Sequence, residues 1–160
     1  MPSLTPSLWF DRNAEQAAEF YVSVFPNSSV DAVTPSPSDN PSTKAGEVLL
    51  VSFTLDGMRF TGINGGPMFT FTEAVSFEID CADQAEVDRY WEALVAGGGE
   101  PGQCGWLKDR FGLSWQVVPR QMGDYLGGAD ADGAARAMQA MLGMQKLDVE
   151  GLRRAYEDAG

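Results

Sequence analysis

The sequence contains the segment NAEQAAEFYVSVFP at residues 13–26, and a segment of the same pattern, DQAEVDRYWEALVAGGG, at residues 83–99. Each begins with a common helix-capping residue and ends at residue types that stop a helix, Pro in the first and Gly in the second. The cap and four helically spaced apolar positions recur at one offset of seventy residues. These positions are Asn13, Ala17, Phe20, Tyr21 and Val24 in the first segment, and Asp83, Val87, Tyr90, Trp91 and Leu94 in the second. We therefore interpret the chain as two copies of one unit.

Strand patterns surround both predicted helices. Residues 7–10 precede the first helix, and residues 75–80, which alternate apolar and polar side chains, precede the second. After the first helix, Asp56-Gly57 lies between two apolar runs and predicts a type I′ hairpin. Residues 106–118 form the corresponding hairpin of the second unit, and aligning the hairpin glycines matches Thr61 with Gln116. The repeated unit is therefore β-α-β-β-β.

The remaining segments are loops and a helical tail. Residues 34–46 are rich in Pro, Ser and Asn and predict an exposed, mobile loop. After Pro119 the pattern becomes helical over residues 134–142 and 147–156, with Asp148 as a cap. We expect a single domain over residues 1–160 with three parts: module one at about 3–64, module two at about 73–119, and a tail at about 120–158. The tail would clamp the sheet or form a dimer contact.

The composition excludes several classes of function. The net charge of −12 argues against nucleic acid and anionic membranes as partners, and no apolar run is long enough to span a bilayer. The N-terminus lacks the pattern of a secretory signal, and the two cysteines form no framework, so we expect a cytoplasmic protein. The chain has no histidine, which removes the commonest general base and the favoured nitrogen ligand of transition metals.

Several motifs resemble one family over nearly the whole chain. They are LWFD at residues 8–11, AAEFY at 17–21, FPNS at 25–28, NGGP at 64–67, AVSF at 74–77, CGWLKDRFG at 104–112 and SWQVVP at 114–119. Together they are similar to the PhnB-like branch of the vicinal-oxygen-chelate superfamily, which includes glyoxalases, bleomycin-resistance proteins and extradiol dioxygenases. Members of this branch often carry the label 3-demethylubiquinone-9 3-methyltransferase.

The resemblance implies an α+β fold, in which two tandem βαβββ modules form a cup-shaped mixed sheet of eight strands, followed here by C-terminal helices. It also implies a homodimer and four ligand positions inside the cup. In this chain those positions fall on Thr5, Thr61, Ala74 and Gln116. Because hydroxyls, a methyl group and one amide are poor partners for a divalent cation, we expect no metal and no other cofactor.

The same strands would still line a cavity for a small organic molecule. By alternation, Thr5, Ser7 and Trp9 share one strand face, while Ser76 and Glu78 share another with Ala74. We therefore expect the cup to be lined by polar and aromatic side chains. The predicted ligand-binding residues are Thr5, Ser7, Trp9, Thr61, Asn64, Ser76, Glu78 and Gln116.

Other interpretations of these residues remain open. Trp9, Trp106 and Trp115 could equally belong to the core or to a dimer interface. Asn64, followed by two glycines, is either a ligand contact or part of a tight turn. A carboxylate in the cup, Glu78 or Asp80, could act as a general base if burial raised its pKa.

Three functions are consistent with these patterns. The first is a metal-free binding protein or enzyme of the superfamily, with an unknown substrate. The second is a cofactor-using enzyme such as the methyltransferase of the label, although no glycine-rich loop follows the first strand to receive S-adenosylmethionine. The third is a structural or regulatory dimer without a ligand. The sequence does not decide whether the protein is an enzyme.

Overall fold

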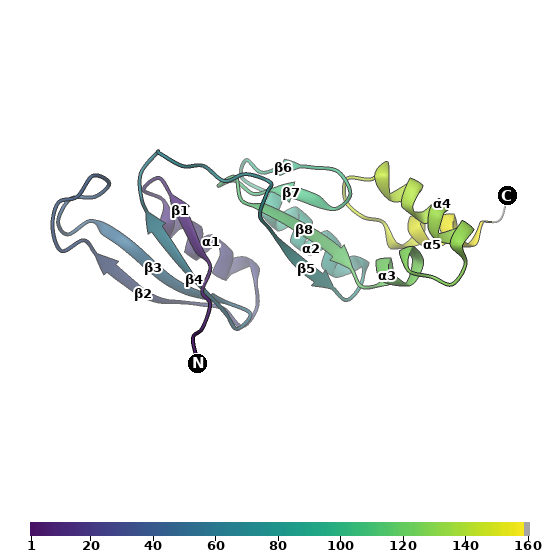
Figure 1. Cartoon of the computed structure of the whole chain (residues 1–160), viewed down its shortest axis with the longest axis horizontal. Coiled ribbons are helices and arrows are strands. Elements are labelled where there is room, and N and C mark those ends of the chain that lie inside the picture. Colours follow the sequence, from purple (N-terminus) through teal and green to yellow (C-terminus); the bar gives the residue numbers. More distant parts are fainter. Residues whose placement is uncertain (159–160) are drawn as a thin grey trace. The chain divides into compact units, whose positions relative to one another are not determined.

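The computed structural model describes residues 1–158 and divides the chain into two compact units. Unit one comprises Met1–Phe71, and unit two begins at Thr72. Figure 1 shows the strands and helix of unit one in purple to blue, and those of unit two in teal to green. Both units contain the predicted β-α-β-β-β order of elements.

Unit one contains a four-stranded mixed sheet with the strand order β1-β4-β3-β2. Its elements are β1 (Ser7–Phe10), α1 (Ala14–Val24), β2 (Ser29–Pro35), β3 (Val48–Leu55) and β4 (Met58–Asn64). Strand β1 runs parallel to β4, whereas β3 pairs antiparallel with both β4 and β2. The first and last strands of the unit are therefore neighbours at one side of the sheet.

Unit two repeats this topology with the strand order β5-β8-β7-β6. Its elements are β5 (Ser76–Cys81), α2 (Gln84–Val95), β6 (Glu100–Pro101), β7 (Trp106–Lys108) and β8 (Ser114–Pro119). Strand β5 is parallel to β8, and β7 is antiparallel to both of its neighbours. The duplication predicted from the seventy-residue offset is confirmed.

The two helices differ in their N-terminal capping, although their sequences share one pattern. The Asp83 carboxylate caps α2 by accepting a hydrogen bond from the Glu86 backbone N–H at 3.0 Å. Asn13 occupies the equivalent position before α1, but its side chain makes no capping hydrogen bond. The predicted apolar stripe is buried over its whole length in α2, and in α1 it is buried at Ala17 and Tyr21.

Each helix packs its apolar stripe against one face of its own sheet. In unit one, the Tyr21 ring stacks on Phe53, which stacks in turn on Phe60 with ring centroids 5.4 Å apart. In unit two, the core includes Trp115, which is only 3% exposed. Side chains alternate along the strands, so buried residues face the helix and half-exposed residues face the other way.

The hairpins follow the sequence prediction in unit one. Asp56 and Gly57 have φ angles of 45° and 82°, the pair of positive values that defines a type I′ turn. The hairpin of unit two has a longer loop, which is organised by Asp109. The Asp109 carboxylate accepts hydrogen bonds from the backbone N–H groups of Phe111 and Leu113 and from the Trp115 indole. Asp109 is 3% exposed.

Most of residues 34–46 are exposed, as predicted for this loop, but two of its side chains are buried. Strand β2 extends to Pro35, and Ser36 and Thr43 are 3% and 5% exposed. The Asn40 side chain explains this packing, because its amide bonds to both of these hydroxyls while its oxygen accepts from the Thr43 backbone N–H. An asparagine side chain thus supplies the hydrogen bonds that regular structure would otherwise provide.

The tail of unit two contains α3 (Gln121–Leu126), α4 (Ala131–Leu142) and α5 (Val149–Glu157). Leu147 and Leu152 are fully buried, and the backbone N–H groups of Cys104 and Gly105 donate to the carbonyls of Met144 and Gln145. The tail is therefore part of the packed structure of unit two. Within residues 1–158, every helix is too short or too polar to cross a membrane.

Candidate functional site

The helix-free face of the sheet in unit one carries three of the predicted site residues. Ser7 and Trp9 on β1 point away from α1, and Ser7 lies directly opposite Thr61 on β4. Trp9 and Thr61 are half-buried, and Ser7 is exposed. This face therefore presents two hydroxyls beside an indole ring.

Trp9 is held in place by the loop that follows β4. Its indole N–H donates to the Gly66 carbonyl at 2.9 Å, and its ring meets the edge of Phe69 with centroids 4.9 Å apart. A β-carbon on Gly65 would lie 2.3 Å from the indole, so only glycine leaves room for the ring. The two glycines of the Asn-Gly-Gly segment thus hold the Trp9 ring in position.

Thr5 does not lie on the first strand, contrary to the sequence prediction. Strand β1 starts at Ser7, and Thr5 is an exposed residue of the preceding segment. Pro6 separates the two and has no N–H with which to continue the ladder. The residue that faces Thr61 across the parallel pair is Ser7.

Asn64 joins three elements of unit one. Its side-chain oxygen accepts a hydrogen bond from the Ala14 N–H at 3.0 Å, and its amide donates to the Val48 carbonyl at 2.9 Å. Asn64 is 5% exposed, and it replaces the missing Asn13 cap at the start of α1. Its side chain has a structural task, and its contact with a ligand stays a prediction.

The helix-free face in unit two brings together the other three predicted residues. Glu78 lies opposite Gln116 in the parallel pair, and Gln116 donates through its amide to the Ser76 hydroxyl at 2.9 Å. Ala74, which was assigned to a ligand position, precedes β5 and is exposed. As with Thr5 in unit one, the predicted ligand position lies two residues before the strand begins. The residue that faces Gln116 across the parallel pair is Glu78.

The residues at these positions do not fit a divalent cation. The paired strands present Ser7 with Thr61 in one unit and Glu78 with Gln116 in the other. Two hydroxyls in unit one, and one carboxylate with one amide in unit two, are each a weak donor set for an ion that must lose its water shell. Among residues 1–158, no three Asp, Glu or Cys side chains gather in a group that could hold a metal.

The two candidate general bases differ in their partners. Asp80 accepts a hydrogen bond from the Arg120 guanidinium at 2.8 Å, and both side chains are exposed. Glu78 is exposed on the sheet face. Neither carboxylate lies in the buried, apolar setting in which we expected a general base.

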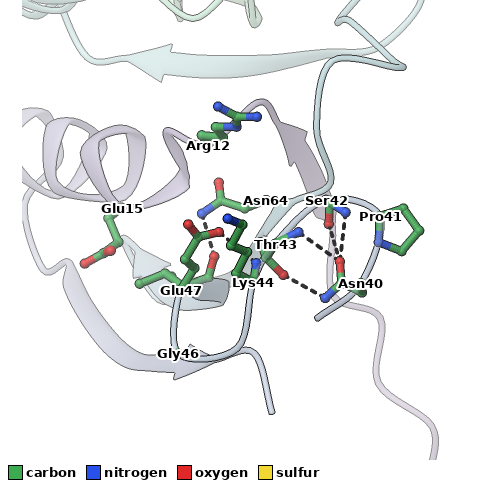
Figure 2. A pocket seen from close by; sticks show the side chains of 11 residues that line it. Arg12, Glu15, Asn40, Pro41, Ser42, Thr43, Lys44, Gly46, Glu47 and Asn64 are labelled. Atoms are coloured by element: carbon green, nitrogen blue, oxygen red, sulfur yellow. Dashed lines mark hydrogen bonds between the residues drawn. The ribbon is translucent and has the colours of Figure 1, made fainter. Parts of the chain in front are cut away.

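A cavity of about 760 Å³ lies in unit one between the start of α1 and the loop before β3. Figure 2 shows Arg12 and Glu15 on one side and Lys44 and Glu47 on the other, with Asn64 between them. The lining carries both signs of charge, and the Lys44 backbone N–H donates to Glu47. The two basic and two acidic residues of the lining therefore balance in charge, and the cavity is polar.

A second cavity, of about 410 Å³, lies wholly within unit two. It is lined by Glu73, Glu100, Pro101, Gly102, Gln103, Trp106, Leu107, Lys108 and Ser114. The Lys108 ammonium forms an ion pair with the Glu73 carboxylate, which raises the pKa of Lys108 and lowers the pKa of Glu73. Ser114 is 1% exposed, and within residues 1–158 its hydroxyl has no hydrogen-bond partner.

Sequence reasoning missed Glu73, Lys108 and Ser114 as members of one site. Alternation along residues 114–118 places Ser114 on the same strand face as Gln116, but it does not predict that Ser114 is buried. The ion pair between Glu73 and Lys108 depends on the conformation of the segment before β5, and no sequence pattern predicts that conformation. Trp106 is half-buried in this cavity, whereas Trp115 belongs to the core, as one of the alternatives proposed.

Solved structures of similar fold define the class of protein. The PhnB protein from Bacillus cereus is 31% identical, and the alignment covers 74% of this chain and 99% of that one, with a TM-score of 0.65. Protein PA1353 from Pseudomonas aeruginosa is 19% identical over 74% of this chain and 98% of its own, with a TM-score of 0.61. FosX, a fosfomycin resistance protein from Listeria monocytogenes solved with Mn(II) and sulfate, is 15% identical over 79% of this chain and 95% of its own, with a TM-score of 0.53. The tandem units and these neighbours show the fold of the vicinal-oxygen-chelate superfamily.

The family within this superfamily follows from the sequence. The family model described as 3-demethylubiquinone-9 3-methyltransferase matches residues 2–118. The chain therefore belongs to this PhnB-like family, and the helices α3 to α5 lie beyond the matched residues. The sequence matches no curated protein.

The residues do not fit the methyl donor that the family description implies. S-adenosylmethionine usually binds where a glycine-rich loop joins a strand to an open helix N-terminus. Here the residues between β1 and α1 are Asp11, Arg12 and Asn13, and the first helical N–H already donates to Asn64. No step through this cofactor follows from the structure.

Proposed function

We propose that the protein binds a small organic molecule on the helix-free faces of its sheets, with no metal ion of its own and with or without turnover. One observation carries the proposal: each sheet buries one face under its helix, while half-exposed polar and indole side chains occupy the other. A small number of polar groups among apolar surface is the usual composition of a small-molecule site.

The proposed contacts in unit one are Ser7, Trp9 and Thr61. The hydrogen bond from the indole N–H to the Gly66 carbonyl fixes the Trp9 ring. A flat ligand could therefore pack on the ring without the entropic cost of ordering that side chain. The two hydroxyls, adjacent across β1 and β4, would orient the polar end of that ligand. In unit two, Ser76, Glu78 and Gln116 are the corresponding contacts.

Two further parts of this proposal concern cofactor and assembly. The donor set at the four positions favours binding without a divalent cation. We also propose that the protein acts as a homodimer, which light scattering at micromolar concentration would test. The geometry at the start of α1 argues against methyl transfer, because its first N–H already donates to Asn64.

The proposal is tested with a library of aromatic and quinone-like compounds. We expect at least one compound to quench tryptophan emission saturably, and we expect Trp9→Phe or Thr61→Val to weaken that binding. Mass spectrometry of the recovered compound then separates a binder, which returns it unchanged, from an enzyme, which yields product. The absence of saturable binding across the library would refute the proposal. Elemental analysis that finds one tightly held divalent ion per chain would refute its metal-free part.

A further inference from the structure

We propose that the cavity of unit two, defined by the nine residues that line it, binds a planar organic ligand through one ligand oxygen. Ser114 and Lys108 would donate to that oxygen, and Trp106 would pack against the body of the ligand. This inference rests on the proposed function, because it assigns a ligand class and a set of contacts to one of the helix-free sheet faces.

Ser114 is the first observation. Ser114 is 1% exposed and is one of the residues that line the cavity, yet no described atom forms a hydrogen bond with its hydroxyl. By strand register it lies between Ser76 and Lys108 on the sheet. Ser76 already receives the Gln116 amide. A buried hydroxyl without a partner lowers the stability of the folded chain, and a ligand oxygen would supply the missing bond.

Lys108 is the second observation. It lies directly opposite Ser114, on the neighbouring strand β7, and its side chain also lines the cavity. The ion pair with Glu73 raises the pKa of Lys108, so the ammonium is charged at neutral pH. An ammonium group has three N–H donors, so it can bind a ligand oxygen in addition to Glu73.

Trp106 supplies an apolar surface next to these donors. It lies two residues from Lys108 on the same face of β7, opposite Gln116 in the ladder, and it is half-buried. The cavity of about 410 Å³ lies within the range of roughly 300–1,000 Å³ that is typical of small-molecule sites. An indole beside two donors favours a flat ligand with an acceptor at one end.

The arrangement favours a ligand oxygen over a ligand cation. The buried hydroxyl and the ammonium can both donate, while the Glu73 carboxylate is already bound to Lys108. Glu100, the other acidic residue of the lining, lies opposite Lys108 in the ladder of β6 and β7. Glu100 is exposed. A carboxylate, a phenolate and a carbonyl share the required chemistry, and a negatively charged oxygen gains most from the ammonium.

Glu73 is then a competitor within the chain. Its carboxylate holds the same ammonium that the ligand oxygen would contact, and the hydrogen bond to Lys108 lowers the pKa of Glu73. Removing its charge should strengthen the binding of an anionic ligand. If the cavity bound a cation instead, the same change would weaken binding.

The experiment uses three probes with one ring and different ends: benzoate, benzamide and benzylammonium. Binding to the full chain is followed by nuclear magnetic resonance, with the Trp106 indole signal assigned through Trp106→Phe. We expect benzoate to bind most tightly and benzylammonium least. Ser114→Ala should weaken benzoate binding about tenfold. The same variant should raise the melting temperature of the unliganded protein, because it removes an unpaired buried hydroxyl.

Two more variants test the roles of Glu73 and Lys108 in binding. Glu73→Gln should tighten benzoate binding severalfold, and Lys108→Gln should abolish the preference for benzoate over benzamide. Lys146→Gln is the matched control, since Lys146 pairs with Asp88 outside the cavity, and its loss should leave benzoate binding unchanged. Tightest binding of benzylammonium, or benzoate binding unaffected by both Ser114→Ala and Lys108→Gln, would overturn the inference. In the second case the proposed function would survive if library compounds still bound, whereas a library without binders would refute the proposed function itself.

Discussion

Replacing Asn64 with alanine should destabilise unit one strongly. The side chain bonds to the Ala14 N–H at 3.0 Å and to the Val48 carbonyl at 2.9 Å, and Ala14 is completely buried. A buried polar group left without its partner costs about 1–3 kcal/mol, so losing both bonds should lower the free energy of unfolding by about 2–4 kcal/mol. The lower end applies if water reaches the Val48 carbonyl, which is half-buried.

Asn13→Ala provides the matched control. An asparagine at the N-cap normally contributes about 0.5–2 kcal/mol, but the Asn13 side chain makes no capping bond here. Its replacement should therefore cost less than about 0.5 kcal/mol. Urea unfolding followed by circular dichroism gives both free energies, and hydrogen exchange at the Ala14 amide reports the start of α1 directly.

Asn64→Asp separates the two bonds. The aspartate oxygen can still accept from the Ala14 N–H, and its charge suits a helix N-terminus. Its second oxygen, however, would face the Val48 carbonyl, which accepts the Asn64 amide in the native protein. We expect a loss between those of the two alanine variants. Equal, small losses for Asn64→Ala and Asn13→Ala would contradict the capping role.

Three further predictions concern other side chains. Asp109→Asn should cost about 2–4 kcal/mol in urea unfolding, since the buried carboxylate accepts three hydrogen bonds, one from Trp115, and an amide would turn a donor toward a donor. Gly65→Ala should displace Trp9, whose indole lies 2.3 Å from the added β-carbon, and a red shift of tryptophan emission would report this; an unchanged spectrum would argue against the contact. Leu147→Ala should cost about 2–5 kcal/mol, because the side chain is fully buried, and a loss below 1 kcal/mol would mean that the tail is not part of the core of unit two.

The repeat was predictable because it depends on local patterns. The apolar stripes, the Asp83 cap and the Asp56-Gly57 hairpin are each encoded within a few residues. The structure confirms the cap, the hairpin and the whole stripe of α2, whereas the stripe of α1 is buried only at Ala17 and Tyr21. It also confirms the strand before each helix, whereas the parallel pairing of the first and last strands was seen only in the structure.

The ends of strands were less predictable. Thr5 and Ala74 were placed on strands that start at Ser7 and Ser76. The start of a strand depends on where its partner strand, here β4 or β8, can pair with it, as well as on local residues such as Pro6. An error of two residues keeps a side chain on the same face but takes it beyond the last ladder partner.

The roles of individual polar residues depended on distant contacts. Asn64 caps a helix that begins fifty residues earlier in the chain, and no local rule reveals that partner. Ser114 follows the expected alternation, but its burial and missing partner depend on how the surrounding residues pack. Residue types and spacing therefore predicted the strands and helices, whereas the contacts of each polar side chain required the three-dimensional arrangement.

The tail has a consequence for biosynthesis. The N–H groups of Cys104 and Gly105 donate to carbonyls that lie forty residues further along the chain. At about 5–20 residues per second, a ribosome needs roughly 2–8 s to deliver those partners after the loop itself has been made. During that interval the strands of unit two are complete but their last supporting segment is missing. A chain that ended after β8 would be about as long as the matched family region, and its Cys104 and Gly105 N–H groups would permanently lack these two carbonyl partners.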